Sequence, residues 1–266
     1  MKLRAAASGV VIWGALAVTL TFLTVPVAAV LVSAPPRELF DALGSPVAVD
    51  ALLLSLQCSL AALAVILIVG TPAAWALATR RFPGRSLAVT LIELPLVLPP
   101  AVAGLGLLAA FGPIGLFGGA LESAGIRLVF ETAGVVVALV FVASPFHIRQ
   151  AQAAFESLEP SLLEASRTLG AGEARTLTRV AIPTVSPALA SGAALAWGRA
   201  LGEFGATLMF AGSLRSVTQT APLAIYDTFS TDLIGAQAIA AVMVAASAAI
   251  LLTAKILGRA AERGDA

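Results

Sequence analysis

The sequence predicts an all-α membrane protein with about six transmembrane helices. Of its 266 residues, 59% are hydrophobic and only 12% are charged, about half of the charged fraction that is typical of a soluble domain. The apolar residues gather in six runs, and each run reaches the roughly 20 residues that a helix needs to cross a bilayer. We therefore expect one transmembrane domain over residues 1–266, embedded in the lipid bilayer.

The first apolar run covers residues 10–32 and follows Lys2 and Arg4. A cleaved signal peptide is the alternative, with Val32-Ser33-Ala34 as the cleavage site. The run is longer than the usual signal core of about 7–15 residues, which favours a retained helix. Residues 33–50 are polar and contain three prolines, so they are expected to form a loop.

The second and third runs cover residues 51–79 and 87–111. The third run is interrupted by Pro95, Pro99 and Pro100, so its helix must kink and its freed carbonyls need partners inside the protein. Residues 111–130 begin with FGPIGLFGG and are expected to form a loop with a short interfacial helix.

The fourth run covers residues 133–155 and should be kinked near Pro145. The fifth covers residues 184–211, and the sixth covers residues 234–257. Between the last two runs we expect a polar loop.

The segment between the fourth and fifth runs is polar, in contrast to the rest of the chain. Within the loop 156–183, residues 164–183 read EASRTLGAGEARTLTRVAIP. Gly170 stands where a helix needs a left-handed residue to end, which predicts two short helices joined by a turn. Pro183 then ends the segment. The alternative is an ordinary amphipathic connector on the membrane surface.

The basic residues predict the orientation in the membrane. If the N-terminus is cytoplasmic, twelve basic residues fall inside and three outside, with Arg199 within a span. The inside set is Lys2, Arg4, Arg80, Arg81, Arg85, Arg149, Arg167, Arg175, Arg179, Lys255, Arg259 and Arg263, and the outside set is Arg37, Arg127 and Arg215. We therefore expect a multi-pass protein of the inner (plasma) membrane with both termini in the cytoplasm.

Arg199, Glu203 and Glu93 are ionisable residues within the apolar runs, where charge is costly and often functional. Arg199 and Glu203 are four residues apart, so they can pair on one helix. The pair either neutralises itself and fixes helix packing, or places Arg199 near the pathway of an anion. Glu93 is expected to be a buried carboxylate that bonds freed backbone or a polar partner.

Glycines in the same region predict close helix packing. Gly198 and Gly202 form a G-x-x-x-G step, and Gly205 follows three residues later. Small residues at this spacing let another helix approach, either at a subunit interface or within the chain.

Several function classes are excluded or disfavoured. Cys58 is the only cysteine and His147 the only histidine, so an intrachain disulfide is impossible and a metal site is not expected. The sequence contains no G-x-x-x-x-G-K-[ST] phosphate loop, so the chain should be no ATPase and carry no cofactor of its own. Nothing indicates binding to nucleic acid.

The polar loop resembles the EAA loop of ABC importer permeases, in which EAA is followed by glycine and an I-x-L-P ending. Here Ser166 replaces the third alanine, and Val180 and Ile182 replace the isoleucine and leucine. The resemblance implies the type I (MetI-like) permease fold and a coupling helix that docks on an ATPase. It assigns coupling roles to Glu164, Ala165, Ser166, Gly170, Ile182 and Pro183.

Residues 198–226 read GRALGEFGATLMFAGSLRSVTQTAPLAIY, which resembles the molybdate permease family, as does LPLVLPPAVAG at 94–104. The resemblance covers about residues 50–255, the core of the domain. It implies a homodimer, two ATPase subunits that bind ATP and Mg²⁺, and a periplasmic or extracellular molybdate-binding protein. Molybdate or tungstate is the expected cargo. The alternatives are a sulfate or thiosulfate permease, and a secondary transporter or channel without an ATPase.

Overall fold

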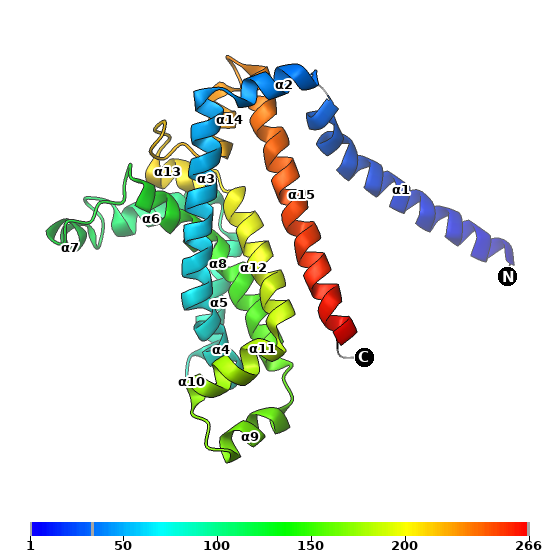
Figure 1. Ribbon diagram of the computed structural model, residues 1–266, viewed down its shortest axis with the longest axis vertical. Helices are drawn as coiled ribbons and strands as arrows, with labels where there is room; N and C mark the ends of the chain where they lie inside the picture. Colours follow the sequence, from blue (N-terminus) through cyan, green and yellow to red (C-terminus); the bar gives the residue numbers. More distant parts are fainter. Residues whose placement is uncertain (1, 33–34, 265–266) are drawn as a thin grey trace.

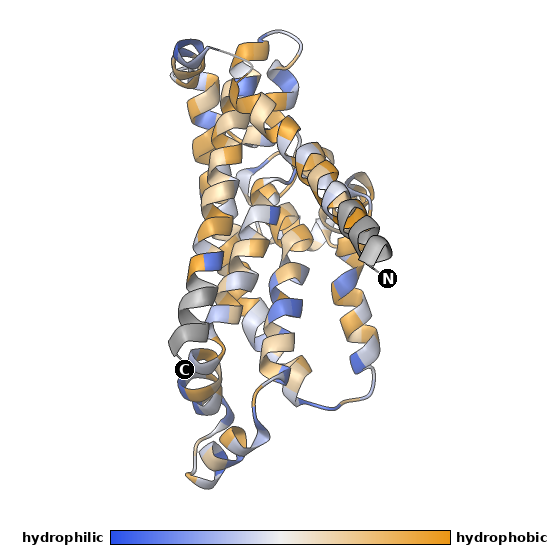
Figure 2. Ribbon diagram, turned by 90° about the vertical axis from the view of Figure 1, so that its right-hand side faces the viewer, coloured by the Kyte–Doolittle hydropathy of each residue, from blue (hydrophilic) through white to orange (hydrophobic). Residues whose placement is uncertain are grey.

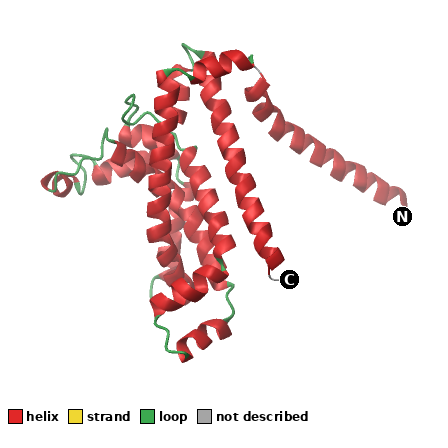
Figure 3. Ribbon diagram, in the orientation of Figure 1, coloured by secondary structure: helices red, strands yellow, loops and turns green. Residues whose placement is uncertain are grey.

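The protein, as a computed structural model, is described over residues 2–32 and 35–264, where every regular element is a helix (Figure 3). The centre of the fold is α8 (Thr132–Glu156). It packs against α3 (Pro46–Val65), α4 (Thr71–Thr79) and α12 (Ser186–Leu201). The buried side chains between these helices are mostly alanine, leucine and valine. The predicted all-α membrane fold is therefore confirmed.

The N-terminal region differs in part from the expectation. α1 (Lys2–Val32) is one helix, and its residues 11–32 are almost wholly exposed. The expected loop 33–50 instead contains α2 (Pro36–Leu43), and α3 begins at Pro46 rather than at residue 51. Proline suits the first helical position because its missing N–H would be unpaired there anyway. Residues 33 and 34 of the alternative cleavage site lie outside the described residues.

The second span is a continuous helical run from Pro46 to Thr79. A single π-helical turn, η1 (Ile66–Gly70), separates α3 from α4. Just after this turn, the Thr71 hydroxyl lies 2.9 Å from Nε2 of the fully buried His147 on α8. The contact ties the second span to the central helix.

The third span is broken rather than kinked. α5 (Arg85–Val97) and α6 (Pro100–Phe111) meet at 120°. Leu98 and Pro99 have extended backbone because each precedes a proline, and that position disfavours the helical region. The expected short helix follows as α7 (Gly118–Ser123).

The last two spans also differ from the prediction in detail. The fifth run is divided into α12 and α13 (Gly205–Ala211), with a non-helical break between them. The expected polar loop contains α14 (Ala221–Thr228), which begins with proline at its second position. The sixth span is confirmed as α15 (Leu233–Gly264). Together the described residues hold four helices of spanning length, or six spans if each bent pair crosses once.

The polar connections gather at the two ends of the bundle. α2 and α14 lie at one end, and α9 (Pro160–Thr168) and α10 (Glu173–Thr176) lie at the other (Figure 1). Apolar residues dominate the length of the helices between these ends (Figure 2). The fold thus places the polar segment 164–183 opposite the loops that the sequence assigns to the outside.

Candidate functional site

The polar segment 164–183 folds as two short helices and a turn, as predicted. α9 begins at Pro160 and ends in a Schellman motif. Gly170 has φ +79°, and its N–H donates to Arg167 O at 2.9 Å, while Ala171 N–H donates to Ser166 O at 3.1 Å. After α10, a π-helical turn η2 (Leu177–Ala181) and α11 (Ile182–Thr184) lead to α12.

The six predicted coupling residues are divided between the surface and the interior. Glu164 and Ala165 are exposed on α9, whereas Ser166 is buried and its hydroxyl lies 2.9 Å from Thr176 Oγ1 on α10. This contact fixes α9 against the rest of the segment. Serine at the third position of the EAA pattern is therefore explained by a hydrogen bond that alanine cannot make.

The other end of the segment redirects the chain. Ile182 is half-buried and packs with Leu177 in an apolar cluster under the coupling segment. Pro183 is exposed, and the helical stretch 173–184 meets α12 at 82°. Pro183 therefore stands at the end of the segment, as predicted.

An exposed apolar residue next to Gly170 was missed in the sequence. Leu169, the residue directly after α9, is 87% exposed, and Leu162 on α9 is 38% exposed. Together with Glu164 and Ala165, Leu169 forms a mixed surface, called here the α9 face, that a partner protein can cover.

The predicted pair between Arg199 and Glu203 is present. Arg199 Nη2 lies 2.6 Å from Glu203 Oε2, and the two side chains are 29% and 0% exposed. The second carboxylate oxygen, Oε1, accepts a 2.7 Å hydrogen bond from Ala206 N–H. Glu203 thus neutralises Arg199 and also satisfies a free N–H in the first turn of α13.

Glu93 is not buried, which corrects the prediction, but it has a polar partner. Its Oε1 lies 2.7 Å from Arg149 Nε, and the two side chains are 41% and 39% exposed. Arg149 also donates to Gln152, which donates to Glu156, and Glu156 accepts from Arg85. The network joins α5 to α8. The sequence assigned Arg149 only to the orientation count, because its partner lies on another helix.

Of the three predicted glycines, one lies at a close helix contact within the chain. A methyl group built on Gly198 meets nothing within 4 Å, and on Gly202 only Gly198 O at 3.7 Å. Within the described part of the chain, these two therefore pack closely against no other helix, and a subunit interface stays the prediction for them. A methyl group on Gly205 would lie 2.6 Å from Pro100 Cβ. A methyl group on Gly104 would lie 2.8 Å from Ala206 O. Glycine thus lets α6 and α13, the two helices after the breaks, come together.

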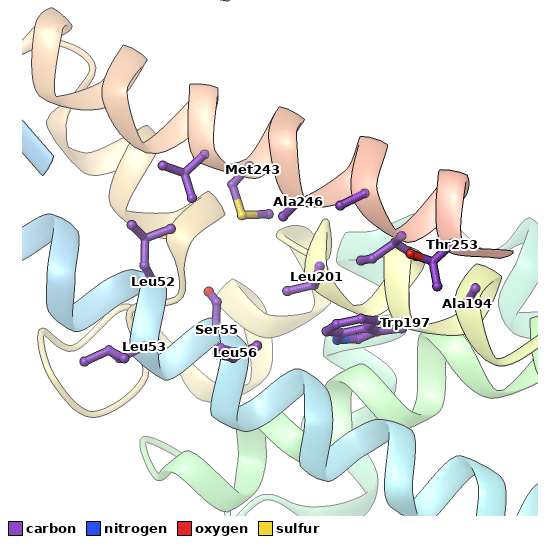
Figure 4. A pocket seen from close by; sticks show the side chains of 13 residues that line it. Leu52, Leu53, Ser55, Leu56, Ala194, Trp197, Leu201, Met243, Ala246 and Thr253 are labelled. Atoms are coloured by element: carbon purple, nitrogen blue, oxygen red, sulfur yellow. The ribbon is translucent and has the colours of Figure 1, made fainter. Parts of the chain in front are cut away.

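A large groove between α3, α12 and α15 is unsuited to an anion. It has a volume of about 560 Å³ and lies among Leu52, Leu56, Met243 and other apolar side chains (Figure 4). Among the described residues, no charged side chain lines it. An oxyanion would lose its hydration there without gaining a partner, so the charged pairs are the better candidates for its pathway.

The chain matches the family described as the binding-protein-dependent transport system inner membrane component over residues 66–264. It is 39% identical over 235 residues to the molybdenum transport system permease protein ModB of Mycobacterium tuberculosis, covering 88% of each chain. It is 37% identical over 221 residues to the sulfate transport system permease protein CysT of Salmonella typhimurium, covering 83% of this chain and 80% of that one.

Among solved structures, a chain of the bacterial alginate ABC transporter bound to its periplasmic protein has a similar fold. The TM-score is 0.72 at 18% identity, over 97% of this chain and 93% of that one.

Proposed function

Because the chain belongs to the family of binding-protein-dependent transport system inner membrane components, we propose that it is the permease of a molybdate or tungstate importer. It is a multi-pass inner-membrane subunit of an ABC importer, which works with an ATPase subunit and a substrate-binding protein. The observation that carries the choice of cargo is the likeness to the molybdenum permease, which extends over 88% of the chain. The sulfate permease is the second candidate, at 37% identity.

The assembly that fits best is a homodimer with two ATPase subunits. Glu93 and Arg149 are each about two-fifths exposed although they lie in apolar spans. Charged groups in a membrane face a water-filled cavity or another protein chain rather than lipid. We therefore assign the side of α5 and α8 that carries this pair to the pathway between two copies. Gly198 and Gly202, which contact no other helix of this chain closely, are free to face the second copy.

The α9 face is the surface for the ATPase. Its exposed Leu169 offers an apolar anchor and Glu164 a charge. The Schellman turn at Gly170 and the bond between Ser166 and Thr176 hold this face against α10. Closure of the ATPase pair upon ATP binding would move the segment as a unit. The bend between α11 and α12 then converts that movement into a tilt of the spans.

The chain itself provides the pathway for the anion rather than a tight binding site for it. Arg199 is partly exposed and its charge is already balanced by Glu203, so a passing dianion gains only a weak, transient contact. Molybdate and sulfate carry the same charge and differ in size. A protein distinguishes anions by size best in a closed cavity with fixed hydrogen bonds. A pathway that opens to each side of the membrane in turn does not keep such a cavity. We assign selectivity to the binding protein.

Uptake into vesicles that contain the permease and its ATPase tests this proposal. The complex is supplied with the binding protein, or with docking-competent variants of altered preference, and uptake of molybdate, tungstate and sulfate is measured. We expect ATP-dependent uptake that follows the preference of the binding protein. Refusal of sulfate delivered by a sulfate-binding variant would place the selectivity in this chain. Uptake driven by an ion gradient without the ATPase would favour a secondary transporter.

A further inference from the structure

The two π-helical turns of the described chain share one sequence arrangement. η1 reads ILIVG and is followed by Thr71 and Pro72, and η2 reads LTRVA and is followed by Ile182 and Pro183. Proline has no N–H, and in a regular α-helix its ring clashes with the carbonyl four residues earlier. A wider turn directly before each proline gives the ring room. The same local chemistry therefore accounts for both turns.

Both π-helical turns border one apolar groove. The groove has a volume of about 450 Å³, and its lining includes Leu67 and Ile68 of η1 and Leu177 and Thr178 of η2. A π-helical turn interrupts the regular hydrogen-bond ladder and lets a helix bend. Close-packed side chains resist such bending, so the open space beside the two turns leaves the backbone freer to move there.

The apolar core is divided at the level of η1. One cluster of buried side chains, called here the span body, joins α3 to the first half of α8 and the second half of α12; its residues come from 54–66, 135–143 and 196–211. A second cluster, called here the coupling body, joins α4 to the second half of α8 and the segment before α12; its residues come from 74–77, 148–158 and 181–185.

The coupling body includes contacts to the segment 164–183. Leu177 and Ile182 pack against its buried side chains. Arg80, at the end of α4, forms an ion pair with Glu173 on α10. α4 therefore forms one packed unit with the segment, at the end of the bundle that carries α9 (Figure 1).

Three helical runs cross the boundary between the two bodies, and each has a residue there that weakens a helix. Gly70 is the last residue of η1, Pro145 lies within α8, and Gly192 lies within α12. Pro145 has no N–H, so the carbonyl of Phe141 loses its helical donor. The two glycines leave the backbone more conformational freedom than any other residue would.

His147 is the common contact of the three runs. It is fully buried, and its Nε2 lies 2.9 Å from Thr71 Oγ1 at the start of α4. A methyl group built on Gly70 would lie 3.6 Å from His147 Cδ2, and one built on Gly192 would lie 3.3 Å from His147 Nδ1. The glycines thus let the second span and α12 approach the same imidazole ring.

We propose that the boundary through Gly70, His147 and Gly192 is a hinge, about which the coupling body turns against the span body during transport. Hinges are formed by a few residues that absorb changes in backbone angles between rigid bodies. The movement would tilt α4 and the second half of α8 while the packing of the span body stays unchanged. This inference rests on the proposed function, in which the ATPase moves the coupling segment.

Hydrogen exchange tests the hinge in the complete permease–ATPase complex, held in lipid nanodiscs and analysed by mass spectrometry. We expect the amides of residues 66–71 and 177–182 to exchange several-fold faster during ATP turnover than without ATP. The amides of residues 54–62, in the span body, are the internal reference and should not respond. Exchange at both turns that is the same with and without ATP would overturn the hinge.

The substitution Pro72→Ala separates a hinge from ordinary packing. The alanine N–H can donate to the carbonyl of Ile68, so the turn should become stiffer and the protein at least as stable. We expect slower exchange over residues 66–71, an unchanged or higher unfolding temperature, and several-fold lower ATP-driven uptake of molybdate. Pro222→Ala is the matched control, because Pro222 is also the second residue of its helix, α14, and no π-helical turn precedes it. It should leave uptake unchanged.

Two results with Pro72→Ala would contradict the hinge. Slower exchange with normal uptake would show that transport does not need this turn to move. A fall in both the unfolding temperature and uptake would give Pro72 a packing role instead. The proposed function is judged separately on the unmodified complex: if it imports none of molybdate, tungstate and sulfate while both turns respond to ATP, the proposed cargo is wrong and the hinge stands.

Discussion

Arg199 and Glu203 form an ion pair across the break between α12 and α13, with 2.6 Å between Nη2 and Oε2. The carboxylate is fully buried, whereas the guanidinium is 29% exposed. The same carboxylate accepts from Ala206 N–H at 2.7 Å. One buried acid thus joins the end of one helix to the start of the next.

This arrangement predicts that Arg199→Ala is less stable than Arg199→Ala combined with Glu203→Gln. The single variant leaves a buried carboxylate without its counter-charge, which costs about 3 kcal/mol. The glutamine of the double variant is neutral and its oxygen can still accept from Ala206 N–H. Thermal unfolding in detergent measures the difference, and equal stability of the two variants would show that the ion pair does not matter to the fold. Loss of uptake in a stable double variant would indicate a role in the pathway.

The packing of α6 on α13 predicts a strong effect at Gly104. A methyl group there would lie 2.6 Å from Met209 Cβ and 2.8 Å from the backbone oxygen of Ala206, so Gly104→Ala should destabilise the protein by about 2 kcal/mol. Gly106→Ala is the matched control on the same helix, because a methyl group there meets no atom of the described residues within 4 Å. It should be neutral or stabilising by up to about 1 kcal/mol. Similar unfolding temperatures for both variants would contradict the observed packing.

The Schellman turn predicts that Gly170→Val uncouples transport from ATP hydrolysis. Gly170 has φ +79°, which a β-branched residue adopts only under strain. Gly172→Val is the control, because Gly172 has φ −70° and open space around it. We expect transport-linked ATP hydrolysis to fall several-fold in the first variant only, with assembly unchanged. If ATP hydrolysis stays coupled to transport in Gly170→Val, the conformation of this turn does not matter to coupling.

The orientation is tested by cysteine labelling in a Cys58→Ala background. Arg37, on α2, and Arg81, in the loop after α4, are both exposed and lie at opposite ends of the bundle (Figure 1). In intact cells or spheroplasts, Arg37→Cys should react with a membrane-impermeant maleimide. Arg81→Cys should react only after permeabilisation. The reverse pattern would place the coupling segment outside the cytoplasm.

Local sequence determined most of the helices. Composition and the length of apolar runs located the spans, since a bilayer demands about 20 apolar residues for each crossing. The turn at Gly170 was also predictable, because the left-handed conformation depends on the residue itself. Proline indicated that the third span is interrupted, although not that it turns by 120°.

Only the tertiary structure decided how distant segments meet. The break after α12 contains no proline, and it exists because Glu203 satisfies the start of α13 while Gly205 packs on Pro100. Helical periodicity relates residues three or four positions apart, so it could pair Arg199 with Glu203. It carries no information about Glu93 with Arg149 or Arg80 with Glu173, which are joined across helices by packing alone.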